Sequence, residues 1–144
     1  MLVAVDGSDN AARAAKVAVA LAKKFGAELI VCHVIPTPTY SSAQAGGVGI
    51  GNELRDFFET ARREANGIVD KVVKLAKADG VEAVSVIREN VFSVVEGIVK
   101  LAEDRSVDLV VIGTRGLGGF RRLLMGSVSS GVINQAHCSV LLVR

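Results

Sequence analysis

The residues with the clearest chemical potential lie in the stretch GTRGLGGFRRLLMGSVSS, which covers residues 113–130. Gly113 and Gly116 have no side chain, so backbone N–H groups could approach a ligand closely there, and φ could be positive where a tight turn requires it. Nine residues separate Gly116 from Gly126, and Ser127 then opens a predicted helix. The first N–H groups of a helix are unpaired and carry partial positive charge, so this stretch predicts a cradle for a phosphate.

Further side chains could complete the cradle. The hydroxyls of Ser127 and Ser129 can donate hydrogen bonds, and Arg115 can make a charge-assisted contact with a phosphate. Composition alone favours a plain turn followed by a helix N-cap, so the binding hypothesis needs a partner across the site. Asp6 could be that partner, because its carboxylate can accept hydrogen bonds from a ribose or base, or reach a phosphate-bound Mg²⁺.

These residues must be positioned by alternating strands and helices. Short apolar runs predict strands at residues 2–5, 28–35, 82–89, 108–112 and 139–144. Stretches of helical period predict helices from Ser8 to Phe25, from Glu53 to Asp79, from Asn90 or Ser93 to about Arg105, and one after Gly126 that carries Val128, Val132, Ile133 and Ala136. The apolar stripe predicted for the long helix comprises Leu54, Phe57, Phe58, Ala61, Ala65, Ile68, Val72 and Leu75. Residues 36–51 have no period and predict a surface loop.

Strands this apolar cannot face water, so they predict a parallel sheet with helices on both faces. The predicted fold class is α/β: a doubly wound, Rossmann-like five-stranded parallel sheet in the order 3-2-1-4-5, in a single domain over residues 1–144. Ligands of such sheets bind beyond the carboxyl ends of the strands where the order reverses, here between the first and fourth strands. Asp6 and Gly113 directly follow these two strands, so we expect them to face one another.

Bulk composition argues against several classes of function. The 144 residues include 17 Lys and Arg against 15 Asp and Glu, a net charge of +2, and 4% aromatic residues, which is no footprint for nucleic acid. No apolar run approaches the ~20 residues that span a bilayer, and the first residues lack the pattern of a signal peptide. We therefore expect a cytoplasmic protein with no membrane partner. Cys32 and Cys138 lack metal-ligand spacing and disulfide density, so we expect reduced thiols.

Other motifs of phosphate chemistry fit less well. No glycine is followed by Lys and then Ser or Thr, so a P-loop is disfavoured, and GxGxxG is absent from the first strand–helix turn. AVDGSD resembles the opening of haloacid-dehalogenase-type phosphatases, but Ala4 stands at the position of their nucleophilic aspartate, which excludes aspartyl-phosphate chemistry. A response-regulator receiver domain would need a fuller acidic cluster. His33 and His137 have no neighbouring nucleophile, which favours a structural role for the first and a surface position for the second.

The spacing G-x2-G-x9-G-[ST] at Gly113, Gly116, Gly126 and Ser127 is similar to the ATP-binding signature of the universal stress protein family. The resemblance extends over the whole chain, through VAVDGS, CHVI, VDLVVIGTRG, MGSVSSGVI and SVLLVR. It implies a five-stranded parallel sheet that binds ATP, or AMP or another adenine nucleotide, at the switch point. Mg²⁺ bound through the phosphates would have Asp6 as its candidate protein ligand.

The resemblance also implies which residues contact the ligand. The adenosine would be held by Ala4, Val5, Asp6 and Val34, with Ile112 against the base. Ribose and phosphates would be wrapped by Gly113, Arg115, Gly116, Gly126, Ser127, Val128 and Ser129. Members of this family commonly pair as homodimers through the edge strand, here Val140–Val143, which would cover an exposed apolar edge.

The leading hypothesis is a nucleotide-dependent regulatory protein of the stress response, in which ATP occupancy sets a loop or dimer-surface conformation and thereby the choice of protein partner. One alternative is an enzyme of the same fold, a slow ATPase or a nucleotidyl-transfer protein. The sequence offers no general base other than Asp6 and no second acidic residue in the signature, so we expect no more than slow ATP hydrolysis. Another alternative is an interaction module that binds no nucleotide.

Overall fold

The structure is a computed structural model that describes residues 1–37, 50–117 and 125–144, with side chains from residue 54 onward in the middle range. Strands β1 to β5 cover Leu2–Ala4, Leu29–Pro36, Ala83–Val91, Leu109–Gly113 and Ser139–Val143. Helices α1 to α4 cover Asp9–Phe25, Ile50–Ala78, Val94–Asp104 and Ser127–Gln135. Each predicted element is present, with small shifts at its ends. Most of the loop predicted at residues 36–51 lies outside the described residues.

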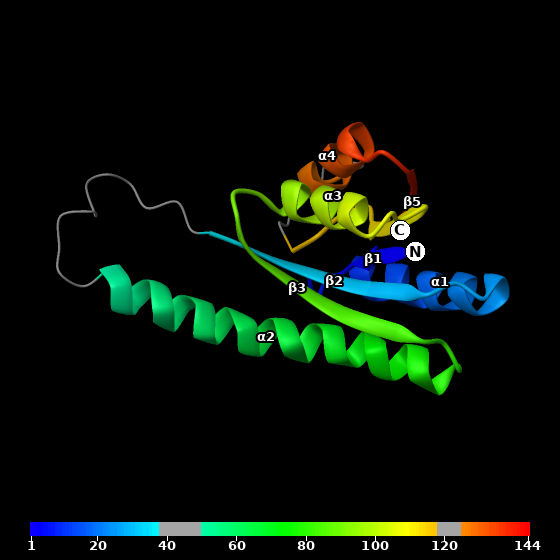
Figure 1. The fold of residues 1–144 in the computed structure, drawn as a ribbon, viewed down its shortest axis with the longest axis horizontal. Coiled ribbons are helices and arrows are strands. Elements are labelled where there is room, and N and C mark those ends of the chain that lie inside the picture. Colours follow the sequence, from blue (N-terminus) through cyan, green and yellow to red (C-terminus); the bar gives the residue numbers. More distant parts are fainter. Residues whose placement is uncertain (38–49, 118–124) are drawn as a thin grey trace.

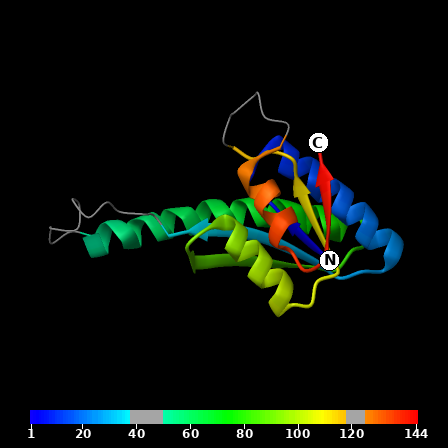
Figure 2. The same ribbon diagram turned by 90° about the horizontal axis from the view of Figure 1, so that it is seen from above.

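The five strands form one parallel sheet in the order β3-β2-β1-β4-β5, which confirms the predicted fold class. β1 pairs with β2 on one side and with β4 on the other, so Val3 lies between Val31 and Val111. Helices α1 and α2 cover one face of the sheet, and α3 and α4 cover the other (Figure 1; Figure 2). Because β1 has helices on both faces and strands on both edges, it must be apolar throughout.

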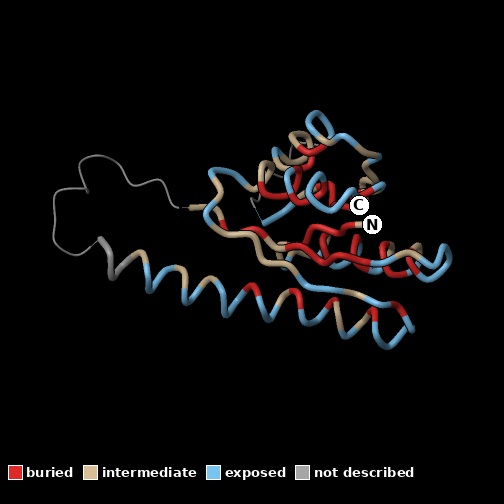
Figure 3. The backbone as a smooth tube through the Cα atoms, viewed as in Figure 1, coloured by how far each residue is buried: buried red, intermediate tan, exposed pale blue. Residues whose placement is uncertain are grey.

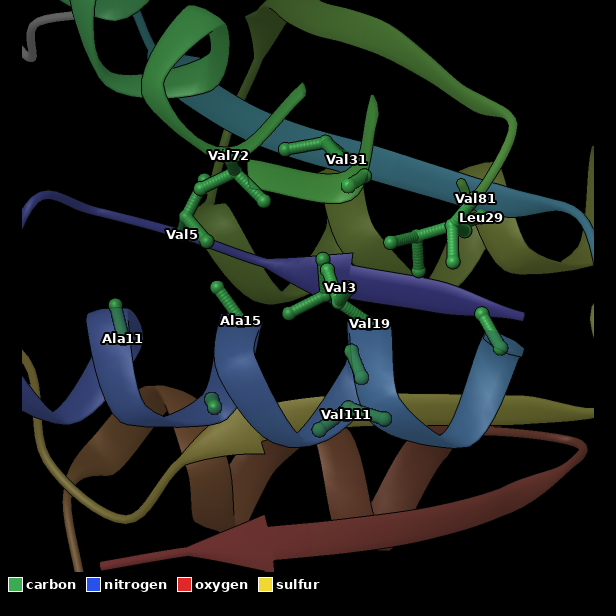
Figure 4. Packing of buried hydrophobic residues seen from close by; sticks show 14 of the residues in the cluster. Val3, Val5, Ala11, Ala15, Val19, Leu29, Val31, Val72, Val81 and Val111 are labelled. Carbon is green, nitrogen blue, oxygen red and sulfur yellow. The ribbon is translucent and has the colours of Figure 1, made fainter. Parts of the chain in front are cut away.

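Alternate residues of β1 enter two different cores. Val3 and Val5 pack with α1, α2 and Val111 (Figure 4). Leu2 and Ala4 point to the opposite face and join the core under α3 and α4. Helix α1 meets the sheet through buried small side chains, which are Ala11, Ala14, Ala15, Ala18 and Ala22. A helix with such a face can lie close to the strands.

The first turn of α1 lies directly against the end of β4. Ser8 caps the helix, because its Oγ accepts a hydrogen bond from the Ala11 N–H at 3.2 Å. A Cβ atom on Gly113 would lie only 2.9 Å from the carbonyl carbon of Asn10, a distance that carbon atoms in proteins essentially never reach. The packing of α1 on β4 therefore requires a glycine at position 113.

Helix α2 packs less of its length than its apolar stripe predicts. Its buried side chains are Ala65, Val69, Val72 and Ala76, of which the predicted stripe missed the second and the fourth. Phe57, which the stripe included, keeps 40% of its surface exposed, and the first turns of the helix extend past the sheet (Figure 3). A helix of 29 residues is about 43 Å long, whereas the nine residues of β3 span about 30 Å, so only part of the stripe can meet the sheet.

Helix α3 begins after Ser93, one of the two starts that the sequence allows. The Ser93 Oγ accepts a hydrogen bond from the Glu96 N–H at 3.1 Å. Asn90, the other candidate, instead lies in β3 with a φ of 56°, a left-handed conformation that asparagine tolerates better than most residues. In the part of the chain that the structure describes, the helices are too short or too polar to cross a bilayer.

We expect Gly113→Ala to lower the free energy of unfolding by about 1–3 kcal/mol, because the new methyl group meets backbone atoms of Asn10 that cannot rotate away. Urea unfolding followed by circular dichroism measures this change. Gly67→Ala is the matched control: nothing lies within 4 Å of a Cβ there, and alanine favours a helix over glycine by about 1 kcal/mol. A Gly113→Ala variant as stable as the unmodified chain would contradict the packing role.

Candidate functional site

A cleft of about 670 Å³ opens at the carboxyl ends of β1, β2 and β4. Its lining includes every residue that the sequence and the family resemblance assigned to a ligand: Ala4, Val5, Asp6, Val34, Ile112, Gly113, Arg115, Gly116, Gly126, Ser127, Val128 and Ser129. A cavity of this volume is typical of small-molecule sites, which enclose about 300–1,000 Å³. The fold thus brings all of these residues together, while their contact with a ligand stays a prediction.

Asp6 lines the cleft and accepts hydrogen bonds from the two segments that follow β1 and β4. Its Oδ1 accepts a hydrogen bond from the Ser8 N–H at 2.9 Å, within the turn that follows β1. Its Oδ2 accepts a hydrogen bond from the Leu117 N–H at 3.1 Å, in the segment that follows β4. A Cβ atom on Gly116 would collide with the same Oδ2. The carboxylate that the sequence placed opposite the glycines therefore lies in direct contact with them.

The N-terminus of α4 forms the opposite wall of the cleft. Gly126 is the N-cap, with φ −78° and ψ 161°, and no side chain among the described residues caps it. The first backbone bond of the helix joins the Ser130 N–H to the Gly126 carbonyl at 3.0 Å. In such a helix end the N–H groups of the first turn have no intrahelical acceptor, so they are available to an anion.

Ser129 connects this helix end to Thr114, the residue that follows β4, through a hydrogen bond. Its Oγ is buried and lies 3.0 Å from the carbonyl oxygens of both Thr114 and Gly126, either of which can accept its hydrogen. The Gly126 N–H donates to the same Thr114 carbonyl at 2.7 Å. Since the hydroxyl hydrogen has acceptors inside the protein, the group that Ser129 can offer a ligand is its backbone N–H.

The signature glycines serve close approach and not unusual backbone angles. In the described residues, the glycines with positive φ are Gly7, Gly26 and Gly80, so Gly113 and Gly116 do not use the positive φ that glycine allows. The physical reason is that Gly113 continues the extended backbone of β4 and meets α1. Gly116 meets Asp6 instead, and at Gly126 a Cβ would make ordinary contacts, the nearest with Thr114 O at 3.4 Å.

The two ends of the cleft differ in polarity. Asp6, Arg115 and the uncapped start of α4 lie at one end, while apolar side chains from β2, β4 and α3 line the rest. The sequence prediction missed eight lining residues: Asn10, Ala11, Cys32, His33, Val94, Ile98, Leu117 and Met125. Val94 and Ile98 are four residues apart and share one face of α3, but no local pattern indicates that this face borders a cleft.

Two titratable side chains of the cleft, His33 and Cys32, are governed by the protein around them. The His33 Nδ1 lies 2.8 Å from the Val5 carbonyl oxygen, which can only accept, so Nδ1 carries the hydrogen. Burial raises the pKa of the Cys32 thiol to about 12, against a smaller opposing effect of the Arg88 charge. Asp6 is the one acidic residue in the described lining, and the described residues include no group of three potential metal ligands.

The chain resembles known proteins over its whole length. Residues 1–144 match the model of the universal stress protein family. A universal stress protein of Thermus aquaticus is 38% identical over 149 aligned residues, with 100% of this chain and 97% of the relative covered. One from Methanocaldococcus jannaschii is 36% identical over 144 residues, with 100% of this chain and 81% of the relative covered.

Solved structures show the same fold. The universal stress protein UspA from Lactobacillus plantarum superposes with a TM-score of 0.87 at 23% identity, over 99% of this chain and 95% of its own. A universal stress protein from Archaeoglobus fulgidus in complex with dAMP has a TM-score of 0.71 at 23% identity and covers 99% and 95%. A universal stress protein in complex with cAMP has a TM-score of 0.63 at 26% identity and covers 99% and 94%.

We expect the two thiols to differ in reactivity. Cys32 lines the cleft but is buried, so its raised pKa leaves almost no thiolate at pH 8, and iodoacetamide should label the partly exposed Cys138 first. Partial burial also raises the pKa of Cys138, so both reactions should be slower than in urea-unfolded protein. Peptide mass spectrometry over a time course measures the order. Faster labelling of Cys32 would show that the cleft opens to water beside this residue.

Proposed function

Because the chain belongs to the universal stress protein family, we propose that it binds ATP in this cleft and acts as a nucleotide-dependent regulatory protein of the stress response. The observation that carries the proposal is the N-terminus of α4, which no described side chain caps and which shares the cleft with Asp6. Free N–H groups suit phosphates, and a carboxylate suits the ribose hydroxyls. The proposed occupant therefore has an anionic and a hydroxylated part.

The shape and polarity of the cleft support a nucleotide with its base at the apolar end. Val34, Val94, Ile98 and Ile112 all line that end, and flat apolar surfaces favour a heterocyclic base. The complexes of neighbouring structures with dAMP and cAMP share an adenine base, which favours adenine here. ATP is the finer proposal, with Mg²⁺ held by the phosphates and Asp6.

A hydrogen bond of Asp6 also suggests how ligand binding in the cleft would change the protein surface. The Asp6 Oδ2 accepts the Leu117 N–H, and Leu117 is 74% exposed. A ribose hydroxyl that donates to this oxygen would share it with the Leu117 N–H and weaken that hydrogen bond, so ligand binding would change how firmly residues 114–117, the described segment after β4, are held. A protein partner that reads this segment would then distinguish the occupied form from the empty one.

An enzyme is the weaker alternative. Asp6 is the one acidic residue in the described lining, so a general base and a metal ligand would have to be the same carboxylate. Loss of ATP turnover in Asp6→Ala with ATP binding retained would favour the enzyme over the regulatory protein. The other alternative is an interaction module that binds no nucleotide. It is not favoured, because it gives no role to the N–H groups at the start of α4.

Isothermal titration tests the nucleotide proposal directly. We expect ATP to bind the purified chain, and acid extraction to release any adenine nucleotide that it retains. Gly126→Val places a side chain where the phosphates approach, so we expect about 10–100-fold weaker ATP binding, the effect of losing one or two charge-assisted hydrogen bonds. Gly126→Ala adds the smallest side chain and keeps ordinary distances to its neighbours, so it guards against misfolding.

Adenosine is the internal control for this experiment, because it lacks phosphates. Its affinity should change little in Gly126→Val, and Gly67→Ala on α2 should bind ATP like the unmodified chain. Absence of both retained and added nucleotide would overturn the proposal, and equal ATP affinity of the Gly126 variants would remove α4 from the site.

We further propose a homodimer through β5. This strand lies at the edge of the sheet, and Val140, Leu141, Leu142 and Val143 are all only partly buried. Pairing with a second copy would satisfy the open edge and cover these side chains. Sedimentation equilibrium should give twice the 15.0 kDa of the chain. A monomer at micromolar concentration would contradict this assembly.

A further inference from the structure

Helix α3 makes an unusually close contact with β2 beside the apolar end of the cleft. A Cβ atom on Gly97 would lie 2.7 Å from Val34 Cγ1 and 3.1 Å from Val34 Cγ2. The first distance is shorter than carbon atoms in proteins tolerate, so with any other residue at 97 either the helix or the Val34 side chain would have to shift. Val34 is 8% exposed and lines the cleft.

The glycine is not explained by backbone conformation. Gly97 lies inside the 11-residue helix α3 and has no positive φ, and its N–H donates to the Ser93 carbonyl at 3.1 Å. A glycine inside a helix costs about 1 kcal/mol relative to alanine. The space that Val34 occupies is therefore the physical reason for it.

The position of α3 is also constrained from its other side. A Cβ atom on Gly131 of α4 would lie 2.6 Å from Val95 Cγ2, so α3 and α4 are in equally close contact. Val91 lies next to the same space, 3.4 Å from a Cβ on Gly97. A side chain at position 97 would therefore have to displace the methyl groups of Val34, because the helix is held against α4.

We propose that Gly97 determines the width of the base-binding end of the cleft and is thereby a positioning residue for the groups that contact the base, an inference that rests on the proposed nucleotide function. Val94 and Ile98, the neighbours of Gly97 on α3, line the cleft together with Val34. The missing side chain at position 97 keeps these three apolar groups at the spacing that a flat base requires. Gly97 itself does not line the cleft and acts through Val34.

Titration of adenosine, AMP and ATP into Gly97→Ala tests this inference. We expect all three affinities to fall by about tenfold, which corresponds to about 1.4 kcal/mol, because the base is common to them. In contrast, the loss in Gly126→Val should grow with the number of phosphates. Gly67→Ala is the matched control, since it makes the same change inside a helix with nothing within 4 Å.

A double variant identifies the contact. Val34→Ala removes the two methyl groups that a Cβ at position 97 would meet, so adding Gly97→Ala to it should change adenosine affinity by less than about twofold. If Gly97→Ala alone does not fold, the comparison of Val34→Ala with the double variant still tests the contact. A further tenfold loss in the double variant would overturn the inference.

The remaining outcomes separate a failure of the proposed function from a failure of this inference alone. If the unmodified chain binds none of the three ligands, the proposed function fails and this inference fails with it. If the unmodified chain binds and a folded Gly97→Ala binds equally well, only this inference fails. A loss in Gly97→Ala that grows with the number of phosphates would also overturn it, because the residue would then act through α4.

Discussion

The pairing of β1 with β4 is the contact on which the rest of the site depends. The connection that leaves β1 leads to α1 on one face of the sheet, whereas the connection that leaves β4 leads to α4 on the other face. The two segments therefore separate as they leave adjacent strands, and the cleft lies between them. Asp6 then spans the entrance, and the N-terminus of α4 forms the opposite wall.

The shape of the cleft is determined by how closely backbones approach one another. Gly113 admits the first turn of α1, Gly116 admits the Asp6 carboxylate, and Gly131 admits Val95. A methyl group at position 113 would meet backbone atoms, whereas one at 116 or 131 would force the Asp6 or Val95 side chain to shift. Glycines in a ligand-binding signature can therefore be required by packing as much as by the ligand, and stability measurements separate the two roles.

Electrostatics complements this packing. The Asp6 carboxylate accepts one N–H from the turn after β1 and one from the segment after β4, while the start of α4 has N–H groups to offer. A ligand with hydroxyls near Asp6 and an anionic group near α4 would fit both.

Local patterns in the sequence already determined the elements and their order. Apolar strand runs, helical periods and the caps at Ser8 and Ser93 depend on neighbours along the chain, so they can be read without a fold. The same holds for Asp6 and Gly113, because each directly follows a predicted strand of a doubly wound sheet. The other residues that the family resemblance assigned to the ligand line the same cleft.

Contacts between distant segments were decided only by the tertiary structure. The sequence could not indicate that Val94 and Ile98 border the cleft, that the first turns of α2 extend past the sheet, or that Gly113 meets Asn10. Residue spacing specifies which side chains share a face of a helix. It does not specify how closely that face approaches a strand, because the distance is determined by the side chains of both elements together.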